Sequence, residues 1–429
     1  MATTIVKIDP RLFRIAIIAA VLICVAGGWF FARWNFANSI SSHLDSSRPE
    51  SRIVAEWLLG IGPSDPQTHF AAALTLEKTF DPSDLAGSLK EYELAASLSP
   101  NNYVMWMNLG KARSANGDIA GSDAAFRKAL DLAPNNASLQ WAYGNSLIRH
   151  GKPADGFSMI VKAASAVPEY SQNAVTMALQ IFEGDIGQIR TVLGDSSATN
   201  AALASALAQQ SRFDDAIECW SKLSPAERTG QYAKLGESLA GKLSIAGKFP
   251  YAASIFSDIR SVESERPAAG QVNNGGFESG VKLSSAGLFE WQVSEGTSPQ
   301  VGLSESQKRT GKYGLVIVFN AFETVAFRNV SQTIAVAPGA EYVLESFYKS
   351  DIRSAASLKW EVIDAATNAS IAVSSPLVPA ADWTPLILRF KAPVAGDGVT
   401  IRLIREGCSG PACPMNGRLA LDDISIKRL

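Results

Sequence analysis

The stretch YVMWMNLGKARSANGDIAGSDAAFRKALDLAPNN, residues 103–136, decides the fold of the region before residue 267. It is one period of a repeat, because Pro66, Pro100, Pro134 and Pro168 lie 34 residues apart. Small residues keep the same register in successive copies: Gly110 and Gly144, Gly117 and Gly151, and Ala95, Ala129 and Ala163. A fixed period of this length is typical of stacked helical hairpins. Such arrays offer a concave surface for binding and supply no chemistry of their own.

The spacing of large and small residues within this stretch points to a family. In chain order the residues concerned are Trp106, Leu109, Gly110, Gly117, Phe126, Ala129 and Pro134. Together they resemble the tetratricopeptide repeat. Gly110 and Ala129 allow two helices to approach, while large apolar side chains fill the space beside them. Arg113 and Ser122 depart from the pattern of this family, as does Gln140 in the next copy.

Further copies extend the array over residues 66–266. A second clear copy spans residues 137–170, and a weaker one spans residues 69–102. The spacing returns in residues 197–230 and 233–266, with a shortened helical pair expected at 171–196. Five or six hairpins are enough to bury a continuous core.

The length of the chain indicates how many domains to expect, and its net charge limits the kinds of partner. A chain of 429 residues is too long for one core, so two or three domains are expected. The net charge is -2, from 39 basic and 41 acidic residues. This balance gives no overall attraction to nucleic acid, and we expect no nucleic-acid partner.

The N-terminal segment predicts a membrane anchor. The run Ile15–Phe31 is apolar for 17 residues, about the lower limit for a spanning helix. Lys7, Arg11 and Arg14 precede it, and only Arg33 is firmly basic just beyond it. The positive-inside rule then makes residues 1–14 a cytoplasmic tail, with a juxtamembrane segment at 32–65 and the bulk of the chain outside.

A cleaved signal peptide is the alternative for this segment, because Cys24-Val25-Ala26 resembles a weak cleavage site. The uncleaved anchor is preferred because aromatic residues continue beyond the apolar run as an interfacial belt. These residues are Trp29, Phe30, Phe31 and Trp34. The expected location is a bacterial inner membrane, crossed once, with the bulk of the chain in the periplasm.

The four cysteines are Cys24, Cys219, Cys408 and Cys413. The last two lie five residues apart in the loop GCSGPACP, and an exported chain favours a disulfide between them. In a reducing compartment both are free thiols. Two cysteines without a neighbouring histidine do not complete a tetrahedral metal site.

The composition and the periodicity of the sequence change after residues 264–271, and a linker is expected at 267–271. Short alternating runs rich in Val, Ile, Phe and Thr follow, separated by turn signals such as Pro338-Gly339. Nine such runs predict an all-β sandwich or jelly roll over residues 272–429. Alternation in the run 357–363 directs Trp360 toward the core.

Three phrases in this region carry a second resemblance: NNGGFE at 273–278, TGKYGL at 310–315 and LALDDI at 419–424. They look like carbohydrate-binding modules of the galactose-binding-like jelly-roll class. That resemblance implies a structural calcium held by Glu278 and Asp422, with carbonyl oxygens near Gly311. The alternative is that both carboxylates only hydrogen-bond to strand ends.

Sugar recognition needs exposed aromatic rings and planar polar side chains. The candidates are residues expected to point away from the core, together with one loop aromatic: Phe322, Phe347, Glu361, Arg389 and Arg402. Only the resemblance of the fold supports these residues as sugar-binding candidates. Many members of this class bind no sugar and pack against protein instead.

On the helical array, four polar residues are candidates for lining the concave face: Arg113, Asn116, Asn145 and Arg149. The alternative is that they form ordinary solvated helix faces. The three histidines, His43, His69 and His150, are scattered and point to no catalytic site.

No catalytic motif occurs in the sequence: neither GxSxG, HExxH, a phosphate-binding GxxxxGK[ST] nor a GxGxxG. The expected function is a non-catalytic, membrane-anchored scaffold that binds a protein partner and polysaccharide, in exopolysaccharide or envelope assembly. The alternatives are a lectin-like receptor with the array as a spacer, and a structural assembly subunit without a ligand.

Overall fold

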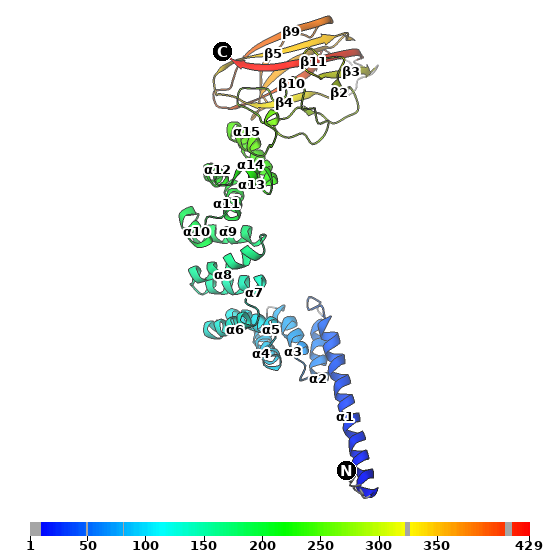
Figure 1. Cartoon of the computed structure of the whole chain (residues 1–429), viewed down its shortest axis with the longest axis vertical. Coiled ribbons are helices and arrows are strands. Elements are labelled where there is room, and N and C mark those ends of the chain that lie inside the picture. Colours follow the sequence, from blue (N-terminus) through cyan, green and yellow to red (C-terminus); the bar gives the residue numbers. More distant parts are fainter. Residues whose placement is uncertain (1–9, 49, 80, 322–326, 408–413) are drawn as a thin grey trace, which may run out of the picture. The chain divides into compact units, whose positions relative to one another are not determined.

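The structure is a computed structural model that describes residues 10–48, 50–79, 81–321, 327–407 and 414–429. The chain forms two compact units, residues 1–194 and residues 195–429. Figure 1 labels the helices of both units and most of the longer strands of the second. Each unit is built differently and is described in turn.

The first unit begins with helix α1, Pro10–Ser42, which contains the predicted span. It is long and apolar enough to cross a membrane, although a signal sequence near the N-terminus meets the same criterion. Its 33 residues correspond to about 50 Å, against about 30 Å for the hydrocarbon core. The C-terminal part of α1 therefore extends well beyond the length that a span requires.

That C-terminal part packs into the helical array. Ala37 is fully buried, and a Cβ placed on Gly62 would lie 2.6 Å from it. Asn38 donates to the carboxylate of Asp65 at 2.9 Å, and Ser41 donates to Thr68 at 3.1 Å. The predicted juxtamembrane segment is thus mostly helical and is joined to the array by buried contacts.

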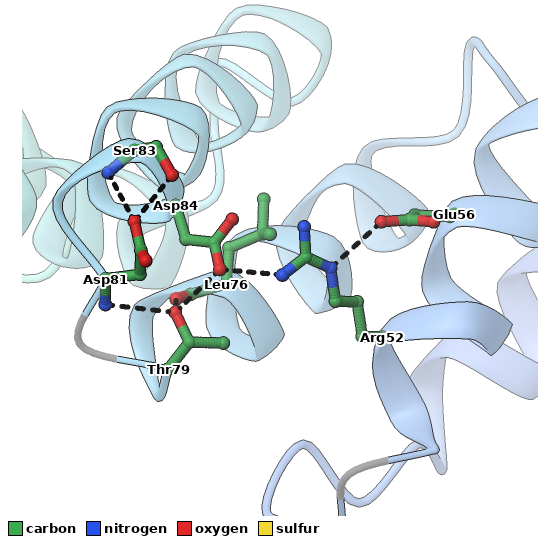
Figure 2. Close-up of polar contacts among 7 residues, drawn as sticks. All are labelled: Arg52, Glu56, Leu76, Thr79, Asp81, Ser83 and Asp84. Carbon is green, nitrogen blue, oxygen red and sulfur yellow. Dashed lines mark hydrogen bonds and ion pairs between the residues drawn. The ribbon is translucent and has the colours of Figure 1, made fainter.

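Helix α2, Ser51–Ile61, continues this connection toward α4, Pro82–Leu98. Arg52 Nη1 lies 2.7 Å from Asp84 Oδ2, which also accepts from the Thr79 hydroxyl at 2.9 Å (Figure 2). Arg52 Nε donates to Glu56 at 3.1 Å. Helix α3, Pro66–Glu77, lies between them in sequence and is capped by Asp65, which accepts from the backbone N–H of Thr68.

The repeats predicted from the 34-residue period form helical hairpins. Their helices are α5 Tyr103–Ala115 with α6 Ile119–Leu132, α7 Ala137–Arg149 with α8 Pro153–Ala166, and the shorter pair α9 Tyr170–Ile181 with α10 Ile186–Leu193. Gly117 and Gly151 have φ of 78° and 76° at the turns, where glycine is favoured. A Cβ on Gly110 would lie 2.8 Å from the Phe126 ring, which explains the small residue there.

The second unit starts with more helices and ends in β structure. The helices are α11 Ser197–Gln209, α12 Phe213–Ser221, α13 Pro225–Thr229, α14 Ala233–Ile245 and α15 Phe249–Asp258, followed by the 3-10 turn η1 Glu263–Glu265. Cys219 and Trp220 are buried in this helical part. Trp220 Nε1 donates to Asp258 at 3.0 Å, linking α12 to the end of α15.

Two antiparallel sheets form the sandwich. Sheet A contains, in spatial order, β1 Gln292–Val293, β4 Val330–Ala335, β10 Gly398–Glu406, β7 Ser357–Asp364 and β8 Ser370–Val373. Sheet B contains β2 Gln300–Ser304, β3 Gly314–Ala321, β11 Met415–Arg428, β5 Glu341–Ser350 and β9 Ala380–Lys391, with β6 Arg353–Ser354 paired to β11. Trp360 is fully buried in the core between the sheets, as the alternation predicts.

Helix α15 is joined to this sandwich by apolar contacts. The rings of Phe256 and Phe289 pack edge to face with centroids 5.7 Å apart. A Cβ on Gly398 would lie 2.3 Å from the Phe249 ring, so α15 approaches the sheet closely there. The change from helix to strand falls near the predicted linker, but the break between compact units lies earlier, between Gly194 and Asp195.

Candidate functional site

The outer face of sheet A is partly covered. Gly398 and Ala335 are paired across β10 and β4, and both point away from the core. Helix α15 packs against β4 at this point, and the backbone N–H of Phe249 donates to Asp397 Oδ1 at 3.0 Å. Ile363, which also points outward, is only 3% exposed. This face is used for packing within the second unit.

Two of the predicted sugar-binding residues lie on this face and bind each other. Arg402 is directly opposite Glu361 across β10 and β7, and its Nε lies 2.7 Å from Glu361 Oε2. The Glu361 side chain is 10% exposed. A cross-strand ion pair of this kind stabilises the sheet.

The outer face of sheet B is open and carries a groove of about 270 Å³. Its floor is a cross-strand row in which Ala420 of β11 pairs with Val316 of β3 on one side and with Lys349 of β5 on the other. Arg418 and Asp351 line the same groove. Short side chains in the row leave the depression, and charged side chains surround it.

The segment 305–313 borders this groove. Trp383 Nε1 donates to the carbonyl oxygen of Lys308 at 3.2 Å, which fixes the position of the half-buried indole. Lys349 Nζ lies 5.5 Å from the centroid of the same ring. Arg309 stacks on Phe347 at 3.6 Å and pairs with Asp423 at 2.6 Å. The lining of the groove therefore contains two cations, Lys349 and Arg418, and the Trp383 ring lies beside Lys349.

The five predicted sugar-binding residues do not form one site. Phe347 belongs to sheet B, but Arg309 stacks against its ring. Arg389 is exposed on β9, paired with Val343 of β5. Glu361 and Arg402 are on sheet A, and Phe322 lies outside the described residues.

Sequence reasoning missed two residues of the groove, Lys349 and Arg418, and the neighbouring Trp383. Lys349 alternates with Phe347 along β5 and could have been found by extending that alternation by two residues. Trp383 and Arg418 carry no comparable signal, because strand pairing brings them near the groove from distant parts of the sequence.

The two carboxylates implied as calcium ligands lie near one another. A Cβ on Gly276 would lie 3.8 Å from Asp422 Oδ1 and 3.9 Å from Glu278 Cγ. Asp422 accepts from the backbone N–H groups of Arg309 at 2.6 Å and Thr310 at 3.1 Å. Burial raises the pKa of Asp422, while these N–H donors act in the opposite direction.

Glu278 is held in the same way, since it accepts from the backbone N–H groups of Lys312 and Tyr313 at 2.9 Å and 3.1 Å. In the described part of the chain no three acidic, histidine or cysteine side chains are grouped for a metal ion. Calcium prefers six to eight oxygen ligands, and the oxygens here face N–H donors. This donor set does not fit a calcium shell as it stands. A calcium ion at Glu278 and Asp422 remains a prediction from the resemblance alone.

The four predicted partner-binding residues of the array make internal contacts. Arg113 pairs with Glu93 at 2.9 Å and also donates to the carbonyl oxygen of Gly121. Asn116 and Asn145 each donate to a backbone carbonyl four residues earlier. Arg149 lies 3.4 Å from the Ser114 hydroxyl. These side chains support the hairpins.

Of the remaining residues considered in the sequence, some are bound within the fold and others lie outside the residues that the structure describes. His69 is bound between Glu91 at 2.5 Å and the carbonyl oxygen of Pro63 at 3.0 Å. Cys24 is a free thiol on α1, and Cys219 is buried within α12. Cys408 and Cys413, the predicted disulfide, lie outside the described residues.

These features define a class, a helical-repeat protein with an N-terminal apolar helix and a C-terminal β-sandwich. The repeat is of the tetratricopeptide type, since residues 103–136 match the tetratricopeptide repeat family model. No curated protein matches the chain in sequence.

Three solved structures are similar to parts of this chain. The CBM22-1-GH10 modules of Clostridium thermocellum endo-1,4-β-D-xylanase 10B, complexed with xylohexaose, are 19% identical, and the match covers 38% of this chain and 29% of that one at a TM-score of 0.26. A carbohydrate-binding module, CBM4, is 17% identical over 37% of this chain and 99% of its own, with a TM-score of 0.28. MamA is 13% identical over 40% of this chain and 83% of its own, with a TM-score of 0.27.

Proposed function

We propose that the chain is a non-catalytic, membrane-anchored adaptor that binds polysaccharide on the open face of sheet B and a protein partner on the helical array. The observation that carries the proposal is the groove of about 270 Å³ beside Trp383 and Lys349. Ligand sites in proteins combine apolar or aromatic surface with a few placed polar groups.

The composition of the groove suits a sugar. An indole ring packs well against the C–H face of a pyranose because the face of the ring carries partial negative charge. Lys349, Ser350, Asp351 and Arg418 offer donors and acceptors for sugar hydroxyls along one side. On sheet A, by contrast, α15 and the Glu361–Arg402 pair occupy part of the outer face.

The array supports the second half of the proposal. Stacked helical hairpins of the tetratricopeptide type present extended concave surfaces that bind other proteins. The sequence also carries none of the common catalytic motifs, and a binding role is the one that both parts of the chain favour.

Location follows from the N-terminal helix. Lys7, Arg11 and Arg14 precede the apolar run, so we place the N-terminus on the cytoplasmic side of a bacterial inner membrane and the residues that follow the span on its periplasmic side. A polysaccharide ligand at that location places the protein in exopolysaccharide or envelope assembly.

A binding experiment tests this function. The full chain is purified in detergent micelles and tested against a panel of bacterial oligosaccharides, beside Trp383→Ala and the control Val373→Ala on the outer face of sheet A. We expect wild type and the Val373 variant to bind the same glycans and the Trp383 variant to lose at least about tenfold in affinity. Equal binding by the wild type and both variants, or binding of no glycan, would contradict the proposal.

A lectin-like receptor, with the array serving as a spacer, is the second candidate. One observation favours it: the four polar array residues selected from the sequence are engaged within the array itself. The receptor would bind glycan as above without any saturable protein partner on residues 66–194. A defined partner whose binding is abolished by array substitutions rules it out.

A further inference from the structure

We infer that the groove on sheet B takes an acidic polysaccharide, one whose sugar units carry carboxylates. This inference rests on the proposed function and specifies the chemical class of its ligand. The evidence for it is which charged side chains around the groove have an ion-pair partner and which, above all Lys349, do not.

Lys349 is half-buried as a residue, and its ammonium group lacks a counterion in the described part of the chain. Its nearest recorded partner is the Trp383 ring, at 5.5 Å from Nζ to the centroid. No described carboxylate lies within ion-pair distance of it, although many other cations of the chain have such a partner. A cation that lies beside an aromatic ring and has no counterion of its own favours an anion from outside the chain.

Four acidic side chains of sheet B and of the segment that follows β5 have partners of their own. Asp351 accepts from the backbone N–H of Arg418, and its other oxygen lies 3.8 Å from Arg418 Nε. Asp423 is paired with Arg309 at 2.6 Å, and Asp422 is fully buried beneath backbone N–H donors. Glu345 lies 3.6 Å from Lys427. These carboxylates are not available to neutralise Lys349.

A second cation stands on the same groove. The Arg418 side chain is 62% exposed and has only the distant contact with Asp351. Because Arg418 and Ala420 are two residues apart on β11 and Ala420 pairs with Lys349, the two cations flank one short stretch of groove. A guanidinium binds a carboxylate through two parallel hydrogen bonds, so Arg418 and Lys349 together suit a uronic acid unit.

The test uses acidic oligosaccharides and their carboxyl-reduced counterparts, which keep the same linkages without the charge. The probes are oligomers of galacturonate, glucuronate-containing hyaluronan and alginate, each titrated into the full chain in detergent. The variants are Lys349→Gln and Arg418→Gln, with Lys391→Gln as the matched control. Lys391 lies on the same sheet, paired with Glu341 and away from the groove.

We expect at least one acidic oligomer to bind about tenfold or more tightly than its reduced counterpart, with the preference lost in Lys349→Gln and kept in Lys391→Gln. The acidic preference should also weaken as salt is raised. Equal binding of acidic and reduced oligomers overturns this inference and leaves polysaccharide binding standing. Binding of neither kind overturns the inference and the proposed glycan function together.

Discussion

The two outer faces of the sandwich are both formed by antiparallel strands, but one face is partly covered by a helix and the other is open. On sheet A, α15 packs against β4, and Glu361 and Arg402 neutralise each other across the sheet. On sheet B, the row from Val316 through Ala420 to Lys349 forms the floor of an open groove. The helices that precede the sandwich cover part of one face, and this covering decides which face is left for a ligand.

The largest effect is expected where the helices cover the sandwich. Phe256 is 2% exposed and contacts Phe289, Gly287 and the guanidinium of Arg260. Phe256→Ala should cost about 3–5 kcal/mol, because it removes a large buried ring and leaves a cavity. Hydrogen exchange of peptides from α15 and β4 in the full chain measures the loss.

The matched control for this prediction is Ile387→Ala on the open face, where the side chain is 61% exposed. It should change stability by less than about 0.5 kcal/mol. Comparable effects of the two substitutions would contradict the distinction between a covered and an open face.

A smaller effect is expected from the ion pair on the covered face. Glu361→Gln keeps the shape of the side chain and removes its charge opposite Arg402, whose side chain is 34% exposed. The expected loss is about 1 kcal/mol, the scale of a cross-strand charged pair. Denaturant unfolding of the full chain measures it, and glycan binding should stay unchanged. Loss of glycan binding with an intact fold would instead assign Glu361 to the ligand site.

Much of this arrangement follows from the sequence, and the reason is periodicity. The 34-residue spacing of prolines and glycines predicts the hairpins because Gly110 must accommodate the Phe126 ring at one fixed place in each repeat. Alternation predicts the inward direction of Trp360 because side chains of a strand point to opposite faces. Both signals are local.

Other features could not be predicted because they depend on contacts between distant segments. Phe347 on sheet B and Glu361 on sheet A both point away from the core. Alternation predicts this direction, but it does not predict which of the two outer faces a helix covers. Strand β2 was missed because its sequence QVGLS contains a glycine and buries only Val301. Helix α2 lies outside the 34-residue period, and its role appears only in its ion pair with Asp84 (Figure 2).

The smallest effect, a dependence on pH, is expected at Glu290 on the covered side. Burial would raise the pKa of this carboxyl, but hydrogen bonds from Lys282 and the backbone N–H of Gly287, with the charge of Arg260, hold it below its ordinary value. A carboxyl with a lowered pKa stabilises the fold above its unfolded pKa, and that contribution is lost as the pH falls through the folded value.

The contact between α15 and the sandwich should therefore weaken below about pH 4.5, by less than about 1 kcal/mol because its partners are partly exposed. Glu290→Gln should flatten the pH dependence of hydrogen exchange in α15 between about pH 5 and about pH 3. The control, Glu305→Gln on the open side, alters only an exposed contact with Lys312 at 3.9 Å and should keep the wild-type slope. The same slope in all three proteins would mean that Glu290 contributes nothing to closing the covered face, and that the apolar contacts of Phe249 and Phe256 hold it alone.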